Sequence, residues 1–572
     1  ALPILEAELA EERQHEWLDE GEAQPCPDCG GARINTVARH VRIQDHTIVD
    51  FVRRPVREAL ARIGSLKFTG LQKTIAADIL PEIRQRLEFM AKVGLDYLSL
   101  DRSAKTLSGG ESQRIRLAAQ LGSNLRGVLY VLDEPTIGLH PRDNNFLLDT
   151  LEALRAKGNS LVIVEHDEET MRRANTIIDL GPGAGSRGGE IVAMGKLEEI
   201  KESPRSQTGR CLRQPMRHPS RGSRRPLKDI PWLELKGARQ NNLKNIDVRF
   251  PVGRLTVITG ISGSGKSTLM RGVLKPALSN PKVAAKGGES YDSLSGVEHV
   301  EAVYEVDQSP IGKTSRSTPA TYIKVFDEIR KQYANLPLSR MRGYTASRFS
   351  FNSEGGRCEA CAGQGVVKVE MNFLPPSYIP CSDCNGKRYN PATLEVLYNG
   401  KSIGDVMEMT LEQAAEFFES NPKISRPLRL LCDTGLGYLK LGQPSPTLSG
   451  GEAQRLKLVS ELIRGVSRSV NDRIRRQRQP KSTVYLLEEP TIGLHIADVE
   501  RLLDVLHRLV DDGQTVIVIE HNMSIAAEAD YIIDIGPEAG ACGGEVVACG
   551  TPEEVAKSKV SRTAPFLREA LA

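Results

Sequence analysis

Short apolar runs without charged residues are the strongest pattern along this chain. Five of them, 129–132, 161–164, 255–259, 484–487 and 516–519, are rich in Val, Leu and Ile. Such runs are typical of parallel strands that helices cover on both faces. We therefore expect an α/β fold, with functional side chains placed where the strands end.

A second pattern follows residue 366, where apolar and polar residues alternate. Val367, Val369, Met371 and Phe373 stand between Lys368, Glu370 and Asn372. A period of two is typical of a strand with one exposed face. Pro375-Pro376 then turns the chain toward Tyr378, so we predict a β-hairpin with an aromatic residue beside its tip.

A glycine-rich turn follows the apolar run 255–259. Its sequence, Gly-Ile-Ser-Gly-Ser-Gly-Lys-Ser from Gly260 to Ser267, matches a phosphate loop in its strand–loop–helix context. The glycines free backbone N–H groups to face phosphates, and the helix dipole adds to the attraction. We expect Lys266 to contact the β- and γ-phosphates of ATP and Ser267 to ligate Mg²⁺. The predicted nucleotide-binding residues of this loop are Gly260, Gly263, Gly265, Lys266, Ser267 and Thr268.

Several motifs occur twice, which indicates a tandem duplication. Leu-Ser-Gly-Gly-Glu stands at 107–111 and 448–452, and Glu-Pro-Thr-Ile-Gly-Leu-His at 134–140 and 489–495. The chain is thus predicted to hold two tandem P-loop ATPase cassettes. The expected segments are 1–200, the C-terminal part of the first cassette; 201–230, a basic linker; and 231–572, a complete second cassette with an insertion at about 280–465.

Only the second copy contains a phosphate loop, and the chain starts with Ala instead of Met. We interpret the chain as a fragment that begins inside the first cassette. Eight basic residues lie between Arg205 and Lys228. This segment could be a solvated linker or an arm that contacts a nucleic-acid backbone, and we interpret it as a linker.

The Leu-Ser-Gly-Gly-Glu motif has the spacing of a capping box, with Ser108 and Glu111 in one copy and Ser449 and Glu452 in the other. A helix that starts there offers free N–H groups and a positive dipole end to an anion. The predicted phosphate-contacting residues are Ser108, Gly109, Gly110, Ser449, Gly450 and Gly451.

Acidic residues end two of the apolar runs. Asp133-Glu134 and Glu488-Glu489 are placed to serve as the Mg²⁺-shell acid and as the acid that positions the attacking water. His166 and His521 follow two further runs, and their recurrence favours contact with the γ-phosphate over a purely structural role. Gln308 is a further candidate for a Mg²⁺ or water contact.

Two cysteine pairs lie between the phosphate loop and the second signature. Cys358-x₂-Cys361 and Cys381-x₂-Cys384 have the spacing of a four-thiolate Zn²⁺ site. Since all four ligands come from the protein, the metal is predicted to be structural. Cys26 and Cys29 form only half of such a site, and we expect no Zn²⁺ there.

Basic and aromatic residues precede these cysteines. Tyr344, Phe349 and Phe351 are interleaved with arginines, a composition that suits phosphate contact and stacking on distorted DNA. A solvated charged face is the alternative. The predicted DNA-contacting residues are Arg340, Arg342, Arg348, Arg357 and Lys368.

The bulk composition adds two limits. The formal net charge is only +3, so any nucleic-acid surface must come from local clustering of basic residues. No apolar run approaches the length of a membrane span, and ten cysteines with four in one close set suit a reducing compartment. We expect a soluble cytoplasmic protein that does not associate with a membrane.

These motifs resemble the ATP-binding cassette superfamily and, within it, the excinuclease A family of bacterial nucleotide excision repair. The likeness is most specific in Thr259–Ser267, Asp307–Gly312, Arg342–Thr345, Arg348–Asn352, Gly355–Cys361 and the doubled Glu-Pro-Thr-Ile-Gly-Leu-His. It implies a head-to-tail pair of cassettes whose ATP sites each combine one phosphate loop with the opposite signature. It further implies binding to damaged double-stranded DNA, a homodimer, and loading of excinuclease B, the second protein of the repair system, whose binding domain we expect to be missing here.

Glu488 departs from the family pattern, which has Asp at this position, as the first copy does at Asp133. A longer side chain is predicted to weaken Mg²⁺-dependent turnover. Two alternatives stay open: a transporter-type ATPase subunit, and a zinc-dependent DNA-binding scaffold that does not hydrolyse ATP. No nuclease centre is apparent in the sequence.

Overall fold

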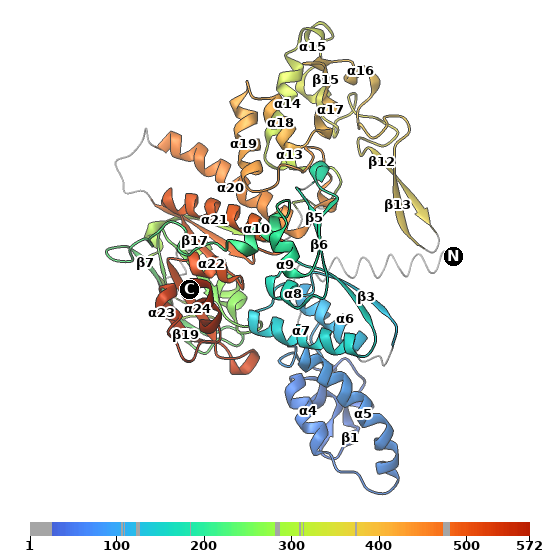
Figure 1. Cartoon of the computed structure of the whole chain (residues 1–572), viewed down its shortest axis with the longest axis vertical. Coiled ribbons are helices and arrows are strands. Elements are labelled where there is room, and N and C mark those ends of the chain that lie inside the picture. The colour runs from blue at the N-terminus through green and yellow to red at the C-terminus, as the bar shows by residue number, and fades with distance from the viewer. Residues whose placement is uncertain are drawn as a thin grey trace. The chain divides into compact units, whose positions relative to one another are not determined.

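The computed structural model describes residues 26–104, 107, 109–121, 126–183, 185–280, 287–307, 311–312, 314–371, 374–472 and 481–572. They fall into two compact units, Ala1–Asn124 and Leu125–Ala572. Figure 1 labels the helices and strands of both units. None of the helices in these ranges is long and apolar enough to cross a membrane.

The first unit is mainly helical. Its described elements are α2 (Thr36–His40), β1 (Arg42–Ile43), β2 (His46–Thr47), α3 (Ile48–Val52), α4 (Val56–Ser65), α5 (Leu71–Lys92) and α6 (Gly109–Leu121). A small core of Val56, Ala59 and Leu87 joins α4 to α5. The hydroxyl of Tyr97 donates to Glu111 Oε1 at 2.6 Å, which ties the start of α6 to the turn after α5.

A six-stranded sheet forms the centre of the second unit. Its order is β11 (Val300–Val306), β16 (Ser482–Glu488), β17 (Thr515–Ile519), β9 (Leu255–Thr259), β18 (Tyr531–Gly536) and β19 (Glu545–Gly550). All neighbouring pairs are parallel except β18 and β19. Every residue of β9 and β17 is buried, as the apolar runs 255–259 and 516–519 predict. Every residue of β18 is buried as well, including Asp534.

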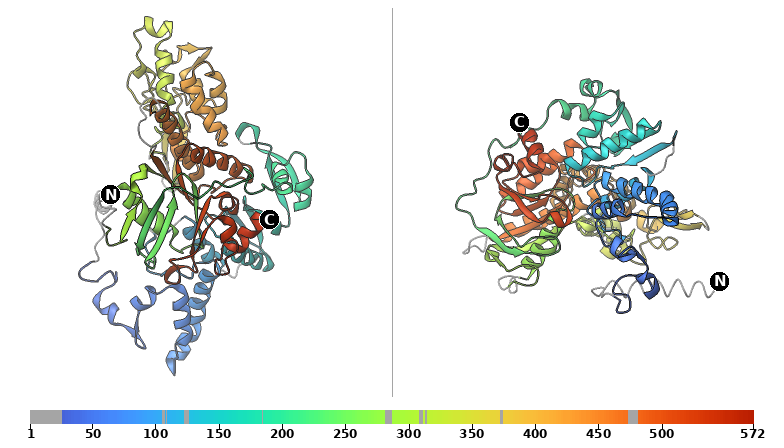
Figure 2. Two further views of the ribbon diagram at one scale, coloured as in Figure 1. Left: turned by 90° about the vertical axis from the view of Figure 1, so that its left-hand side faces the viewer. Right: turned by 90° about the horizontal axis from the view of Figure 1, so that it is seen from below.

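Both faces of this sheet are covered. One face packs on η3 (Thr268–Leu274, a π-helical stretch), on α11 (Lys275–Ser279) and on an antiparallel sheet of β10 (Ser293–Ser295), β7 (Trp232–Ala238) and β8 (Ile246–Pro251). The other face packs on α21 (Ile496–Asp511) and α22 (Met523–Glu528). α23 (Pro552–Val555) and α24 (Ala564–Leu571) complete this side, near the C-terminus in Figure 2.

The first copy of the cassette motifs forms two separate strand pairs among the described residues. β3 (Leu129–Asp133) pairs in parallel with β4 (Ser160–Val164), and β5 (Ile177–Gly181) pairs antiparallel with β6 (Glu190–Gly195). Their counterparts in the second copy are joined through β9. Apolar side chains such as Val131 and Val162 are exposed here. α7 (Pro141–Ala156) and α8 (Glu168–Arg173) accompany these strands.

The insertion forms a helical module with its own core. Its helices are α13 (Pro319–Tyr322), α14 (Val325–Ala334), α15 (Pro337–Met341), α16 (Pro391–Leu394), α17 (Ile403–Glu408), α18 (Leu411–Phe417), α19 (Pro422–Asp433) and α20 (Gly450–Asp472). Two short strands, β14 (Leu397–Tyr398) and β15 (Lys401–Ser402), lie among them. The predicted hairpin is confirmed as β12 (Val366–Met371) and β13 (Leu374–Pro380), and it projects from the module in Figure 1. The predicted turn at Pro375-Pro376 is wrong, because both prolines lie within β13 and Tyr378 pairs with Lys368 along the strand instead of lying beside the tip. Phe373 lies outside the described residues.

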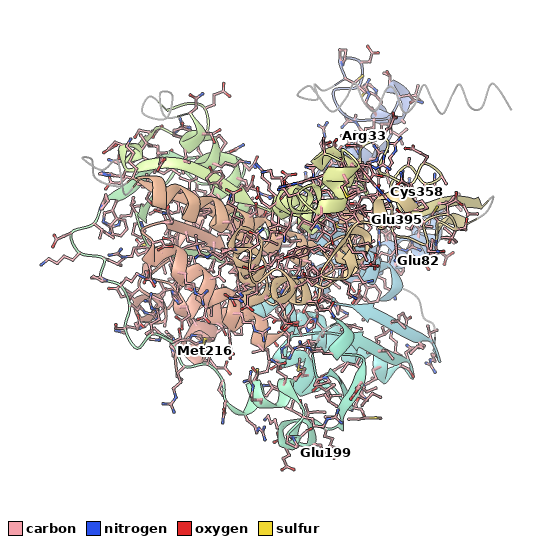
Figure 3. All side chains as sticks on the ribbon, turned by 90° about the horizontal axis from the view of Figure 1, so that it is seen from above. Arg33, Glu82, Glu199, Met216, Cys358 and Glu395 are labelled. Atoms are coloured by element: carbon pink, nitrogen blue, oxygen red, sulfur yellow. The ribbon has the colours of Figure 1, made fainter. Side chains whose placement is uncertain are left out.

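The segment predicted as a linker, 201–230, contains helices and ion pairs. α9 (Leu197–Glu202) and α10 (Gln207–Arg213) begin the segment, and the remainder runs over the second cassette. Met216, labelled in Figure 3, packs against the core beneath α21. Arg221 and Arg225 pair with Asp511 at 2.7 Å each. Opposite charges distant in the sequence therefore anchor this basic segment.

Candidate nucleotide site and zinc module

Three parallel strands place the predicted catalytic residues at one edge of the sheet. β9 leads into the phosphate loop, β16 ends at Glu488, and β17 leads to His521. Because neighbouring parallel strands end at the same edge, the phosphate loop, Glu489 and His521 come together there.

The phosphate loop is closely packed against β18, the strand beside β9 in the sheet. Gly260 has φ of 134°, and a Cβ at this position would lie 2.1 Å from the carbonyl oxygen of Ile535. Lys266 Nζ donates to the carbonyl oxygens of Gly260 at 3.0 Å and Ile261 at 2.8 Å. Burial lowers the pKa of Lys266 to about 8. The loop thus holds a buried cation where phosphates are expected.

Ser267 and Glu488 form the predicted Mg²⁺ pair. Ser267 Oγ donates to Glu488 Oε1 at 2.6 Å, and Arg271 Nη1 lies 2.6 Å from Glu488 Oε2. A hydroxyl beside a carboxylate is a donor set that suits Mg²⁺. Arg271, on η3, is a contact that the sequence motifs did not indicate.

Glu489 and His521 are brought together as predicted. Glu489 adopts a left-handed backbone with φ of 46°, a strained conformation typical of functional sites. His521 Nε2 lies 3.6 Å from Glu489 Oε1. Glu520 fixes the loop, because its carboxylate accepts backbone N–H groups of Thr491 and His521.

The first copy repeats this arrangement. Glu134 has φ of 43°, and His166 Nε2 lies 3.7 Å from its Oε1. Asp133 ends β3 and occupies the position of Glu488. Burial raises the pKa of Glu134. The two copies share the same arrangement of glutamate and histidine.

The doubled Glu-Pro-Thr-Ile-Gly-Leu-His loops of the two copies meet each other. A Cβ on Gly138 would lie 2.9 Å from Glu489 Oε2, and a Cβ on Gly493 would lie 3.2 Å from Glu134 Oε1. Ser262 of the phosphate loop donates to the carbonyl oxygen of Gly138 at 3.0 Å. Each loop therefore borders the glutamate of the opposite copy.

The second signature forms the predicted capping box. The N–H of Ser449 donates to Glu452 Oε2 at 2.7 Å, and the N–H of Glu452 donates to Ser449 Oγ at 3.3 Å. Gly450 and Gly451 begin α20. In the first unit Gly109 and Gly110 begin α6, whereas Ser108 and Gln308 lie outside the described residues.

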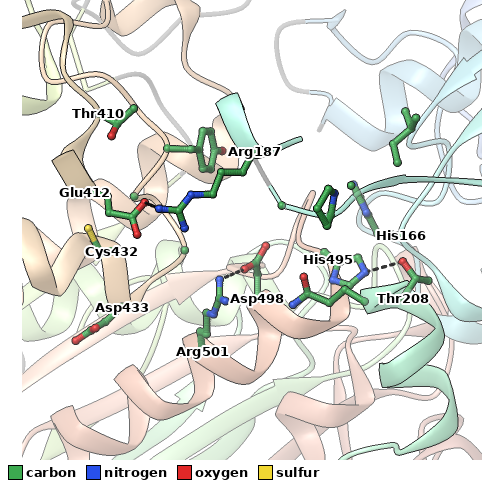
Figure 4. A pocket seen from close by; sticks show the side chains of 18 of the residues that line it. His166, Arg187, Thr208, Thr410, Glu412, Cys432, Asp433, His495, Asp498 and Arg501 are labelled. Atoms are coloured by element: carbon green, nitrogen blue, oxygen red, sulfur yellow. Dashed lines mark hydrogen bonds and ion pairs between the residues drawn. The ribbon is translucent and has the colours of Figure 1, made fainter. Parts of the chain in front are cut away.

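A cavity of about 660 Å³ lies on the first-copy side of the second unit. Figure 4 shows His166 and His495 at one end, with Arg187 paired to Glu412 across the opening at 2.8 Å. Gly181 and Tyr438 also line it. The cavity joins the His166 strand end to the helical module that carries the second signature.

The four predicted zinc ligands form one buried cluster. Their sulfur atoms all lie within 4.8 Å of one another, with Cys358 Sγ 4.0 Å from Cys381 Sγ and Cys361 Sγ 3.7 Å from Cys384 Sγ. Zn–S bonds of about 2.3 Å in a tetrahedron require sulfur atoms roughly 3.8 Å apart, so these thiols fit Zn²⁺. No other such cluster occurs within the described ranges. Cys358 is labelled in Figure 3.

The predicted DNA-contacting arginines differ in their surroundings. Arg342 pairs with Glu395 at 2.7 Å, and Arg357 pairs with Glu359 at 3.1 Å. Arg348 stacks on Tyr344 at 4.6 Å. Arg340 and Lys368 are exposed.

The predicted stacking role of Phe349 and Phe351 is wrong. Both rings are fully buried in the core of the helical module. Phe351 packs against Phe326, and Phe349 packs against Tyr333. Apolar burial fixes these rings, so Tyr344 is the aromatic side chain left beside the arginines.

A buried polar chain beside the site was missed at the sequence level. Asp534 on β18 accepts hydrogen bonds from Thr259 at 2.7 Å and from Thr563 at 2.8 Å. His140 lies 3.2 Å from the Thr563 hydroxyl. Asp179, Thr208 and His495 repeat these positions in the other copy, and that recurrence is the signal that could have found them.

Comparison with known proteins agrees with this geometry. The chain is 57% identical over 547 residues to UvrABC system protein A of Thermus thermophilus, which covers 95% of the chain and 56% of that protein. It is 52% identical over 578 residues to UvrABC system protein A of Aquifex aeolicus, covering 61% of that protein. No protein-family model matches the chain.

A solved structure of a similar protein also matches this chain. UvrA2 from Deinococcus radiodurans matches with a TM-score of 0.86 and 47% identity, over 96% of this chain and 66% of that one. The chain thus spans a little over half the length of the curated relatives that it matches. On these relatives and this fold, the chain belongs to the UvrABC system protein A family of ATP-binding cassette proteins.

Proposed function

We propose that this chain carries the ATP-dependent DNA-damage-recognition activity of bacterial nucleotide excision repair. The observation that carries the proposal is the nesting of a four-thiolate module within the cassette that holds Lys266, Ser267, Glu488, Glu489 and His521. Binding and hydrolysis of ATP would then change the affinity of the helical module for DNA.

The chemistry proposed at the nucleotide site follows from its side chains. Lys266 and the N–H groups of the phosphate loop neutralise the phosphates, and Ser267 with Glu488 would hold Mg²⁺, which offsets the charge that develops on the leaving group. Glu489 orients the attacking water, and His521 contacts the γ-phosphate. Ser108, Gly109 and Gly110 are proposed to complete this site, while Asp133, Glu134, His166 and Ser449–Gly451 belong to a second one.

Zn²⁺ on Cys358, Cys361, Cys381 and Cys384 is proposed to be structural. It would hold together the ends of the β12 and β13 strands next to the cysteines. Val367, Lys368 and Tyr378 of this hairpin are exposed. Arg340, Arg342, Arg348 and Arg357 are the proposed phosphate contacts. Since no described helix has the features of a major-groove reader, binding is proposed to follow backbone shape and deformability.

The partners proposed for the whole protein are damaged double-stranded DNA, a second copy of the chain, and excinuclease B, with incision left to the other proteins of the repair system. This function belongs in the cytoplasm. The test is ATP hydrolysis with lesion-bearing or undamaged duplex, together with DNA retention at rising salt. A chain that binds lesions but hydrolyses no ATP would support the scaffold alternative, and one indifferent to DNA would support the transporter-type alternative.

A further inference from the structure

A continuous chain of buried side chains links the first copy's Glu-Pro-Thr-Ile-Gly-Leu-His loop to the second copy's phosphate loop. It runs from His140 through Thr563 and Asp534 to Thr259, and all four side chains are at most 1% exposed. Thr259 is the last residue of β9 and directly precedes Gly260. This series of hydrogen-bonded side chains therefore ends one residue before the loop that is predicted to bind phosphates.

The hydrogen bonds assign a direction to each contact. The N–H of Arg142 donates to His140 Nδ1 at 3.2 Å, so Nδ1 accepts and the proton of the neutral ring is on Nε2. His140 Nε2 then donates to Thr563 Oγ1 at 3.2 Å. Thr563 donates in turn to Asp534 Oδ1 at 2.8 Å, and Thr259 donates to the same oxygen at 2.7 Å.

The surroundings of His140 keep its ring neutral. Burial, with the nearby charge of Lys266, lowers the pKa of His140 to about 3. The ring packs edge-on against His521 at 6.0 Å and against Phe566 at 5.6 Å. A single tautomer therefore persists at working pH, and the order of donors and acceptors does not change.

We propose that His140 is a positioning residue for ATP turnover, which acts through Thr563, Asp534 and Thr259 to hold the phosphate loop of the opposite cassette. Docking of the first copy's loop would thereby set the geometry at Lys266. The expected changes in turnover rest on the proposed function, because they require that the chain hydrolyses ATP.

The duplication supplies a matched control. His495 Nε2 lies 3.0 Å from Thr208 Oγ1, and Thr208 donates to Asp179 at 2.9 Å, as Figure 4 shows for the first of these contacts. Within the described residues Asp179 accepts from Ser206 and Thr208 and pairs through β5 with β6 alone. Among the described residues, Asp179 and Thr208 thus make the same hydrogen bonds as Asp534 and Thr563, but no strand that leads into a phosphate loop is bonded to Asp179.

The test compares Thr563→Val, Thr563→Ser, His140→Asn and Thr208→Val. Valine removes the hydroxyl at nearly constant volume, serine restores it, and asparagine retains an acceptor for the α7 cap but cannot reach Thr563. We expect kcat to fall roughly tenfold in T563V and H140N, consistent with the loss of a buried hydrogen bond, with KM for ATP within about twofold. T563S and T208V should stay within about twofold of the native kcat.

Hydrogen exchange of the backbone amides of Leu255–Thr259 provides the second measurement. Exchange should accelerate in T563V and H140N and stay native in T208V. Native turnover and exchange in T563V, or equal effects in T208V and T563V, would overturn the proposal. If the native chain hydrolysed no ATP, the proposed function would fail. The hydrogen-exchange comparison alone would then decide whether the hydrogen bonds from His140 to Thr259 stabilise β9.

Discussion

Ser267 Oγ donates to Glu488 Oε1 at 2.6 Å, while the other carboxylate oxygen of Glu488 lies 2.6 Å from Arg271 Nη1. The first copy has Asp133 at the matching position. The extra methylene of Glu moves the carboxylate by about 1 Å, and misplacement of that size can cost roughly 10²-fold in rate. We therefore expect Glu488→Asp to raise Mg²⁺-dependent ATP turnover by about tenfold or more.

The measurement is steady-state hydrolysis as a function of Mg²⁺ concentration. Asp133→Glu, which makes the converse change in the other copy, is the matched variant and should not accelerate turnover. A Glu488→Asp protein that hydrolyses ATP more slowly than the native chain would show that Glu488 is correctly placed through Arg271.

The pKa of Lys266 predicts how nucleotide affinity depends on pH. Burial lowers this pKa to about 8, and only the charged lysine attracts the phosphates. Affinity for ATP should fall by up to about tenfold per pH unit above pH 8. Equilibrium binding without Mg²⁺ measures this, and Lys266→Met should bind weakly with no break near pH 8. A native profile that stays flat to pH 10 would contradict the prediction.

The zinc prediction concerns the thiol cluster. Cys381→Ser should reduce bound Zn²⁺ from about one ion per chain to near zero, because a closed four-thiolate site needs every ligand. Metal analysis after gel filtration measures this, and Cys542→Ser, which alters an exposed cysteine, is the control. Retention of a full zinc ion by Cys381→Ser would remove the basis for the proposed module.

The anchored basic segment predicts a stability change. Arg225 reaches Asp530, whose side chain is 2% exposed, at 3.2 Å, so its removal leaves a buried carboxylate without this counter-ion. We expect Arg225→Met to lower the free energy of unfolding by about 3 kcal/mol. Arg205→Met removes an exposed pair with Glu190 and should cost less than about 1 kcal/mol. Urea denaturation compares the two, and equal losses would speak against the anchoring role of Arg225.

Local pattern was sufficient to predict the parallel strands, the phosphate loop, the capping box at Ser449 and the cysteine cluster, since each depends on residues close in the sequence. Long-range pairing was not predictable in this way. The ion pairs of the basic segment could not be foreseen, because its partners, such as Asp511, lie far away in the chain. Phe349 and Phe351 were assigned to DNA because nothing in their spacing shows that the helical module buries them.

The central claim is that the nucleotide site and the zinc module act on DNA as one unit. Its most direct test is the rate of ATP hydrolysis as lesion-bearing duplex is added, for the native chain and for Cys381→Ser. The account predicts that lesion-bearing duplex changes the native rate more than undamaged duplex does, and that the substitution abolishes the difference. A native rate that is the same with either duplex, or a difference that survives the loss of Zn²⁺, would contradict it.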